Sequence, residues 1–228
     1  MGDIEQQGIP DNLSSSTETQ VDNQAQATTD MKTKRKSMPD KQRLKQVAEY
    51  HGLRLVAYMA IFAALDAWVL ASDLLVANVL SVIAALIVAN YLAGIFHEWG
   101  HFSGARLAKS RSPIVPKPSG TFVFGFNMEK NTSKQFLAMS LGGPIANWLL
   151  VALVFILIPI DNAGRAALFA MVFGRAVGVI IFEGPIIART MNGGLPQQEL
   201  DNQLDNGSLD RSQVIGYVTA AAIWLLAV

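Results

Sequence analysis

Long runs of apolar residues are the feature that most constrains the fold of this chain. Four segments, residues 55–71, 74–96, 136–159 and 166–188, are apolar over nearly their whole length. Each is close to the roughly 20 residues that an α-helix needs to cross the hydrocarbon core of a bilayer. A fifth apolar segment, residues 214–228, is short for a span. We therefore expect an all-α polytopic membrane protein with four to five transmembrane helices and the lipid bilayer as a partner.

The N-terminal part of the chain has the opposite composition. Residues 1–48 consist mostly of polar side chains and offer almost nothing to bury, so we expect a disordered polar segment before a transmembrane domain at residues 53–228. Basic residues cluster between positions 32 and 54, and others follow the second and fourth apolar segments. This pattern predicts a cytosolic N-terminus. The basic cluster has no interleaved aromatic residues, so nucleic acid is not an expected partner, and the oligomeric state is not predicted.

The loop between the second and third apolar segments carries a different signal. Pro113, Pro116 and Pro118 are followed by an aromatic and β-branched run at residues 121–128. Such a run after a glycine is typical of a short strand. We expect a short β-hairpin or re-entrant loop here.

A His-Glu-x-x-His motif, formed by His97, Glu98 and His101, lies where the second apolar segment ends. Residues four apart on a helix share a face, so both imidazoles can bind one metal ion. Glu98 can then act as general base on a water that the metal activates, which makes Zn²⁺ the expected cofactor. Two histidines that merely cap a helix end are the alternative, but ionisable groups inside a span are costly and usually functional. Because the chain has no cysteine, any further ligand must be a carboxylate, imidazole or amide. The sequence therefore predicts a metal site near the cytosolic end of the second span.

Three sequence blocks resemble the site-2 protease family of intramembrane zinc metallopeptidases, over residues 80–194. Residues 94–106 look like the family's zinc helix, and residues 133–148 resemble its third span with a Gly-Pro-x-x-Asn element. The third block is Met-Asn-Gly-Gly at residues 191–194. The resemblance implies regulated intramembrane proteolysis, in which a zinc endopeptidase cleaves a transmembrane protein substrate. It also implies that Asn147 orients the substrate or stabilises the oxyanion.

The third zinc ligand is where this chain departs from the family, which has an Asp-Gly pair where Asn192 stands here. An amide oxygen is a weaker ligand for zinc than a carboxylate, so we consider two replacements. Glu183 lies about 9 Å before Arg189 along a helix, at a depth that matches the two histidines, although it could instead pair with Arg175. Asp201 has a family-like spacing from a proline but lies in polar sequence, where a solvated acid is the simpler interpretation. We rank Asn192 first by register, Glu183 second by depth and Asp201 last.

Two other functions fit parts of the sequence. A catalytically inactive membrane scaffold of the same fold is favoured by Asn192. A small transporter would use Asp66, Arg175 and Glu183 along a polar path, but it leaves the His-Glu-x-x-His spacing unexplained. Asp66 is expected to pair with Arg175 or to line a polar cavity, and His51 is expected to be solvated.

Overall fold

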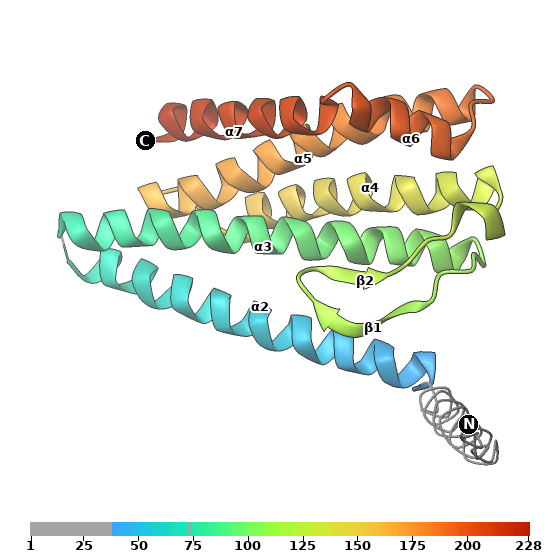
Figure 1. Ribbon diagram of the computed structural model, residues 1–228. Helices are drawn as coiled ribbons and strands as arrows, with labels where there is room; N and C mark the ends of the chain where they lie inside the picture. Colours follow the sequence, from blue (N-terminus) through green and yellow to red (C-terminus); the bar gives the residue numbers. More distant parts are fainter. Residues whose placement is uncertain (1–37, 73) are drawn as a thin grey trace, which may run out of the picture. The chain divides into compact units, whose positions relative to one another are not determined.

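A computed structural model of the protein describes residues 38–72 and 74–228, and it confirms the all-α polytopic membrane fold (Figure 1). Four helices are long and apolar enough to cross a membrane: α2 (Asp40–Ala71), α3 (Leu75–Leu107), α4 (Ser133–Leu157) and α5 (Ala163–Met191). Two shorter helices follow toward the C-terminus: α6 (Pro196–Asp205) and α7 (Ser208–Ala227). Helix α3 packs against α2, α4 and α5, so the helix that carries the His-Glu-x-x-His motif is surrounded by the other three spans.

Helix α2 begins earlier than the sequence predicted. Residues 40–48, which we had assigned to the disordered segment, form its first turns, whereas residues 1–37 lie outside the part of the chain that the structure describes. Val47 is 0% exposed and packs with Phe102 and Val123. Tertiary contacts therefore order a stretch whose composition alone offers little to bury.

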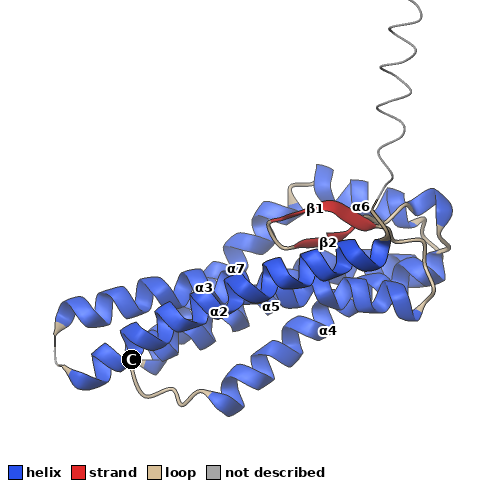
Figure 2. Ribbon diagram, turned by 90° about the horizontal axis from the view of Figure 1, so that it is seen from below, coloured by secondary structure: helices blue, strands red, loops and turns tan. Residues whose placement is uncertain are grey.

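The predicted hairpin is present as strands β1 (Ile114–Ser119) and β2 (Phe122–Phe124), which pair antiparallel. Gly120 makes the turn with a φ of +55°, a left-handed conformation that glycine adopts without steric cost. Strand β1 lies along the first turns of α2, and β2 contacts α3 (Figure 2). These neighbours bury Ile114 and Val123, whereas Phe122 stays 61% exposed, so protein contacts cover one side of the hairpin.

Small residues bring α3 and α4 together. A Cβ atom on Gly142 would overlap the carbonyl oxygen of Gly100, and a Cβ on Gly104 would overlap the carbonyl oxygen of Ala138. Such positions allow two helix backbones to approach within contact distance. As a result, Gly143 on α4 faces the histidine-bearing side of α3.

A buried ion pair joins α2 to the start of α5. Asp66 Oδ2 lies 2.7 Å from Arg165 Nη2, and Asp161 Oδ1 lies 2.9 Å from Arg165 Nη1. The expectation that Asp66 pairs with Arg175 was therefore wrong. Arg165 begins α5 beside the last turns of α2, so it meets Asp66 at the same end of the helical bundle.

Candidate metal centre

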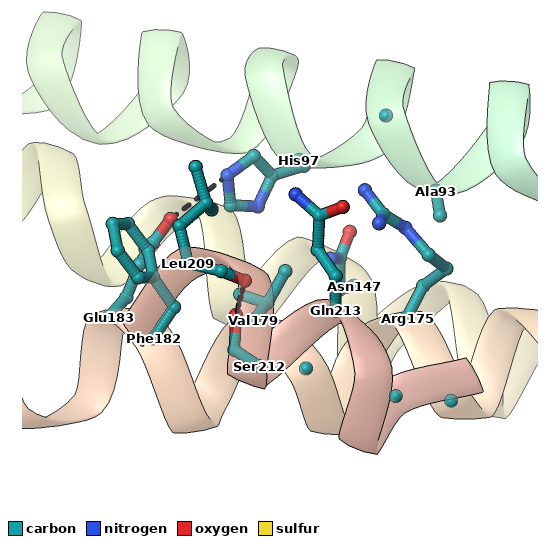
Figure 3. A pocket seen from close by; sticks show the side chains of 14 residues that line it. Ala93, His97, Asn147, Arg175, Val179, Phe182, Glu183, Leu209, Ser212 and Gln213 are labelled. Carbon is teal, nitrogen blue, oxygen red and sulfur yellow. Dashed lines mark hydrogen bonds and ion pairs between the residues drawn. The ribbon is translucent and has the colours of Figure 1, made fainter. Parts of the chain in front are cut away.

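Three side chains from two helices converge on one point. The Nε2 atoms of His97 and His101 lie 2.9 Å apart on α3. Glu183 Oε1, from α5, lies 3.0 Å from His97 Nε2 and 3.3 Å from His101 Nε2. Figure 3 shows the Glu183 carboxylate facing the His97 ring. The three ligand atoms lie within 4.8 Å of one another, so the group could hold a metal ion.

The hydrogen bonding of His101 shows which ring nitrogen is available. Its Nδ1 atom lies 2.8 Å from the backbone carbonyl oxygen of Met139, which can only accept, so Nδ1 carries the proton and donates. The Nε2 atom of the neutral ring then presents its lone pair to His97 and Glu183. A backbone carbonyl that fixes the second nitrogen in this way is the usual support of a metal-binding histidine.

The spacing of the three donors fits zinc. Tetrahedral ligands at about 2.1 Å from Zn²⁺ lie about 3.4 Å from one another. The separations of 2.9, 3.0 and 3.3 Å need only a small outward movement to reach that geometry. Three electron-pair donors facing one point repel each other unless a cation lies between them. Glu183 Oε2 is also buried without a hydrogen-bond partner, so the carboxylate has a second oxygen to offer.

Gly143 on α4 leaves room for both imidazoles. A Cβ atom there would lie 2.5 Å from His101 Cε1 and 2.7 Å from His97 Cε1, well inside van der Waals contact. The contact of Gly142 with Gly100 shows that the α4 backbone lies close to α3 at this level. The close approach of the two helix backbones thus occurs directly against the imidazole rings.

The structure brings Glu183, and not Asn192, to the two imidazoles. Asn192 caps the C-terminus of α5 and is exposed, about 13 Å beyond Glu183 along the helix axis. The choice by register was wrong because α5 stays helical through Met191, which carries position 192 past the site. Asp201 is exposed on α6, where Gln197 Nε2 donates a hydrogen bond to it at 2.8 Å. The argument from membrane depth identified the carboxylate that lies beside the two imidazoles.

Glu98 faces a cavity on the hairpin side of the cluster. This cavity has a volume of about 490 Å³, and His97, His101 and Glu183 form part of its wall. The rest of the wall is largely apolar and includes Phe122, Phe124, Phe126, Phe136 and Phe182. A carboxylate beside the metal ligands, in an otherwise apolar chamber, has the position expected of a general base.

Asn147 lines a second cavity, on the opposite side of His97 and Glu183. Its side chain is 2% exposed, and Oδ1 is buried without a hydrogen-bond partner in the described part of the chain. This cavity measures about 180 Å³ and also contains Arg175 (Figure 3). The amide of Asn147 is thus available to a bound molecule, as the sequence-based role requires.

His51 is a buried residue that the sequence analysis had placed in solvent. It is 3% exposed, accepts a hydrogen bond at Nδ1 from Trp99 Nε1 at 3.1 Å, and its Nε2 lies 3.2 Å from the carbonyl oxygen of Gly120. An indole N–H can only donate, so the ring is neutral and Nε2 donates to Gly120. This contact joins α2, the hairpin turn and the residue that follows Glu98. The signal in the sequence was the spacing of Val47 and His51, which puts both on one helix face.

Comparison of the chain with protein-family models, with curated proteins and with solved structures gave no match. What is established is a membrane protein of four apolar spanning helices, with a His97–His101–Glu183 group that could hold a metal ion.

Proposed function

We propose that this protein is an intramembrane zinc metalloendopeptidase. It would hydrolyse a peptide bond in or near a transmembrane segment of another membrane protein. The observation that carries the proposal is the convergence of His97, His101 and Glu183 beside Glu98, between helices apolar enough to span a bilayer. Two imidazoles and one carboxylate form a three-ligand set that catalytic zinc sites use while keeping one position open.

Each residue of the site has a role in this reaction. A zinc ion held by the two imidazoles and Glu183 would supply Lewis-acid activation of water and of the scissile carbonyl group. Glu98 accepts the proton of the attacking water and delivers it to the leaving amine. Asn147 donates from its amide nitrogen to the carbonyl oxygen that becomes negatively charged. Its unpaired Oδ1 can accept from a substrate backbone N–H.

The surroundings of the cluster support a membrane-embedded substrate. The largely apolar walls of the 490 Å³ cavity suit apolar side chains of an unwound transmembrane segment. The distribution of basic residues favours a position near the cytosolic face, at the C-terminal end of α3. Cleavage is therefore expected near the cytosolic end of the substrate's span.

The test combines metal analysis with cleavage of synthetic transmembrane peptides by the purified chain in lipid nanodiscs. Glu98→Gln should keep about one zinc per chain and lose cleavage, because only the proton carrier is removed. His97→Ala should lose both zinc and cleavage. Glu129→Gln is the matched control, because Glu129 is an exposed glutamate far from Glu98 in the sequence. Cleavage by Glu98→Gln at the wild-type rate, or zinc content that His97→Ala leaves unchanged, would refute the proposal.

No observation on the described residues specifically favours either alternative function. The inactive scaffold was favoured by Asn192, but Glu183 offers a carboxylate to the two imidazoles. The transporter was favoured by charges inside the spans, of which Asp66 is paired with Arg165.

A further inference from the structure

An arginine without a counter-ion lies in the 180 Å³ cavity. Arg175 is on α5, and its Nε atom is buried with no hydrogen-bond partner. Within residues 38–72 and 74–228, no carboxylate comes within 4.0 Å of its guanidinium group. The nearby acids are engaged elsewhere: Glu183 with the two imidazoles, and Asp66 with Arg165. The sequence-based expectation that Arg175 pairs with Glu183 or Asp66 was therefore wrong.

Other polar groups face the same space. Figure 3 shows the guanidinium group of Arg175 and the amides of Asn147 and Gln213 directed into the cavity, which continues to His97 and Glu183. These groups come from α4, α5 and α7, so no single helix forms the cavity. Gly174 on α5 touches the carbonyl of Gly216 on α7, and this contact holds α7 against the cavity. Helix α3 completes the wall with Ala93, Gly94 and His97, so four helices build the site.

An unpaired guanidinium inside a span is costly, and such groups usually mark a functional site. A carboxylate is its best partner, because the planar guanidinium can donate two parallel charge-assisted hydrogen bonds to the two oxygens. The flanking amides add neutral donors. A carboxylate in a substrate's transmembrane segment carries a similar cost in lipid, so pairing with Arg175 benefits both groups.

We propose that this cavity is a subsite for a carboxylate of the substrate, with Arg175 as the residue that selects it; the inference rests on the proposed peptidase function. Arg175 precedes Glu183 by about 12 Å along the α5 axis. An extended chain covers about 3.3–3.6 Å per residue. The carboxylate therefore belongs to a position three or four residues from the bond that is cleaved. It comes either from an Asp or Glu side chain or from the free end of the chain.

Binding to a cleavage-inactive protein tests the subsite. The full chain with Glu98→Gln, in lipid nanodiscs, is titrated with fluorescent transmembrane peptides of one apolar sequence. One set has an amidated C-terminus and a single Glu placed at successive positions. A second set has no Glu and ends in a free carboxylate at those positions. The reference peptide carries Gln and an amidated end.

The best carboxylate-bearing peptide is expected to bind about tenfold more tightly than the reference, equivalent to about 1.4 kcal/mol. Tight binding in the first set identifies an acidic side chain as the ligand, and tight binding in the second identifies a chain end. Arg175→Gln should abolish the preference. Arg175→Lys should retain part of it, because the charge stays but the paired donors are lost. Arg189→Gln removes a half-exposed arginine at the end of the same helix and should change nothing.

Equal affinity for all peptides, no binding by any of them, or a preference that persists in Arg175→Gln would overturn the subsite. The comparison of peptides on one protein needs no change at Arg175, so it holds even if that variant fails to fold. Cleavage by the chain with Glu98 intact is followed in parallel. A carboxylate preference without any cleavage would overturn the peptidase and keep the subsite, whereas cleavage without a preference would overturn the subsite alone.

Discussion

Replacing Gly143 with alanine is expected to lower zinc affinity and peptide cleavage by about a hundredfold. The new methyl group would lie 2.5 Å from His101 Cε1, 2.6 Å from His101 Nε2 and 2.7 Å from His97 Cε1, where ordinary contacts begin at 3.4 Å. Both rings must therefore move by nearly 1 Å, since 3.4 less 2.5 or 2.7 leaves 0.9 or 0.7 Å. Functional constellations tolerate about 0.5 Å, and a 1 Å displacement costs about a hundredfold.

The assay is competition for zinc against a chromophoric chelator, followed by cleavage of the peptides described above. Gly52→Ala is the matched control, because Gly52 is also helical and a Cβ there would meet nothing within 4 Å. Circular dichroism and size-exclusion chromatography establish that both variants are folded. A folded Gly143→Ala protein with wild-type zinc affinity would refute the reasoning, because the imidazoles could not then lie against α4.

Three further predictions concern the carboxylate ligand and two buried contacts. Glu183→Gln should reduce bound zinc far below one per chain while Asn192→Ala keeps it; metal analysis after dialysis that gives the reverse result would return the ligand to position 192. Asp66→Asn leaves Arg165 without its 2.7 Å partner, in a pair whose side chains are 13% and 15% exposed. Because Asp161 still pairs with Arg165, the substitution should destabilise the fold by only about 1–3 kcal/mol, and an unchanged unfolding transition in detergent would contradict this. His51→Ala removes two partly buried hydrogen bonds, to Trp99 Nε1 and to the carbonyl oxygen of Gly120, at about 0.5–1.5 kcal/mol each, and should accelerate hydrogen exchange in the β1–β2 hairpin; exchange at the wild-type rate would show that the contact does not hold the hairpin.

The fold followed from the sequence because it depends on local quantities. Segment length and hydropathy predict spanning helices without knowledge of their neighbours, and all four predicted spans are helices. The i, i+4 spacing of His97 and His101 likewise predicts that both imidazoles share a face. The hairpin followed from the aromatic run after Gly120.

Contacts between helices could not be predicted in the same way. Arg165 and Arg175 both lie in α5, and only the packing of α2 against the first of them decides which one pairs with Asp66. The burial of His51 depends on the hairpin that folds back onto α2, and the spacing of Val47 and His51 reveals their shared helix face but not the segment that covers it. The start of α2 was predicted too late in the sequence for the same reason, because Val47 is buried by residues far along the chain.

For the third ligand, the argument from membrane depth and the argument from sequence register select different residues. The argument from register relied on the sequence spacing between His101 and Asn192, whereas α5 remains helical through Met191 and carries Asn192 past the imidazoles. The argument from membrane depth looks for a carboxylate at the same depth as the imidazoles. Glu183 meets this condition, and an unpaired carboxylate inside a span would be too costly to keep. The physical cost of a buried charge is therefore the better guide to a ligand in a membrane helix.

The candidate metal centre depends on three helices, although only two of them supply the converging His97, His101 and Glu183 side chains. Helix α4 contributes a carbonyl oxygen, from Met139, that fixes the tautomer of His101, and an empty side-chain position, at Gly143, that the rings occupy. Both contributions require α4 to lie at one distance from α3, and the contact of Gly142 with Gly100 sets that distance. Any change that separates these helices must loosen the ligands and remove the support of His101 together. The glycine block on α4 is thus as necessary to the geometry of the candidate site as the histidines on α3.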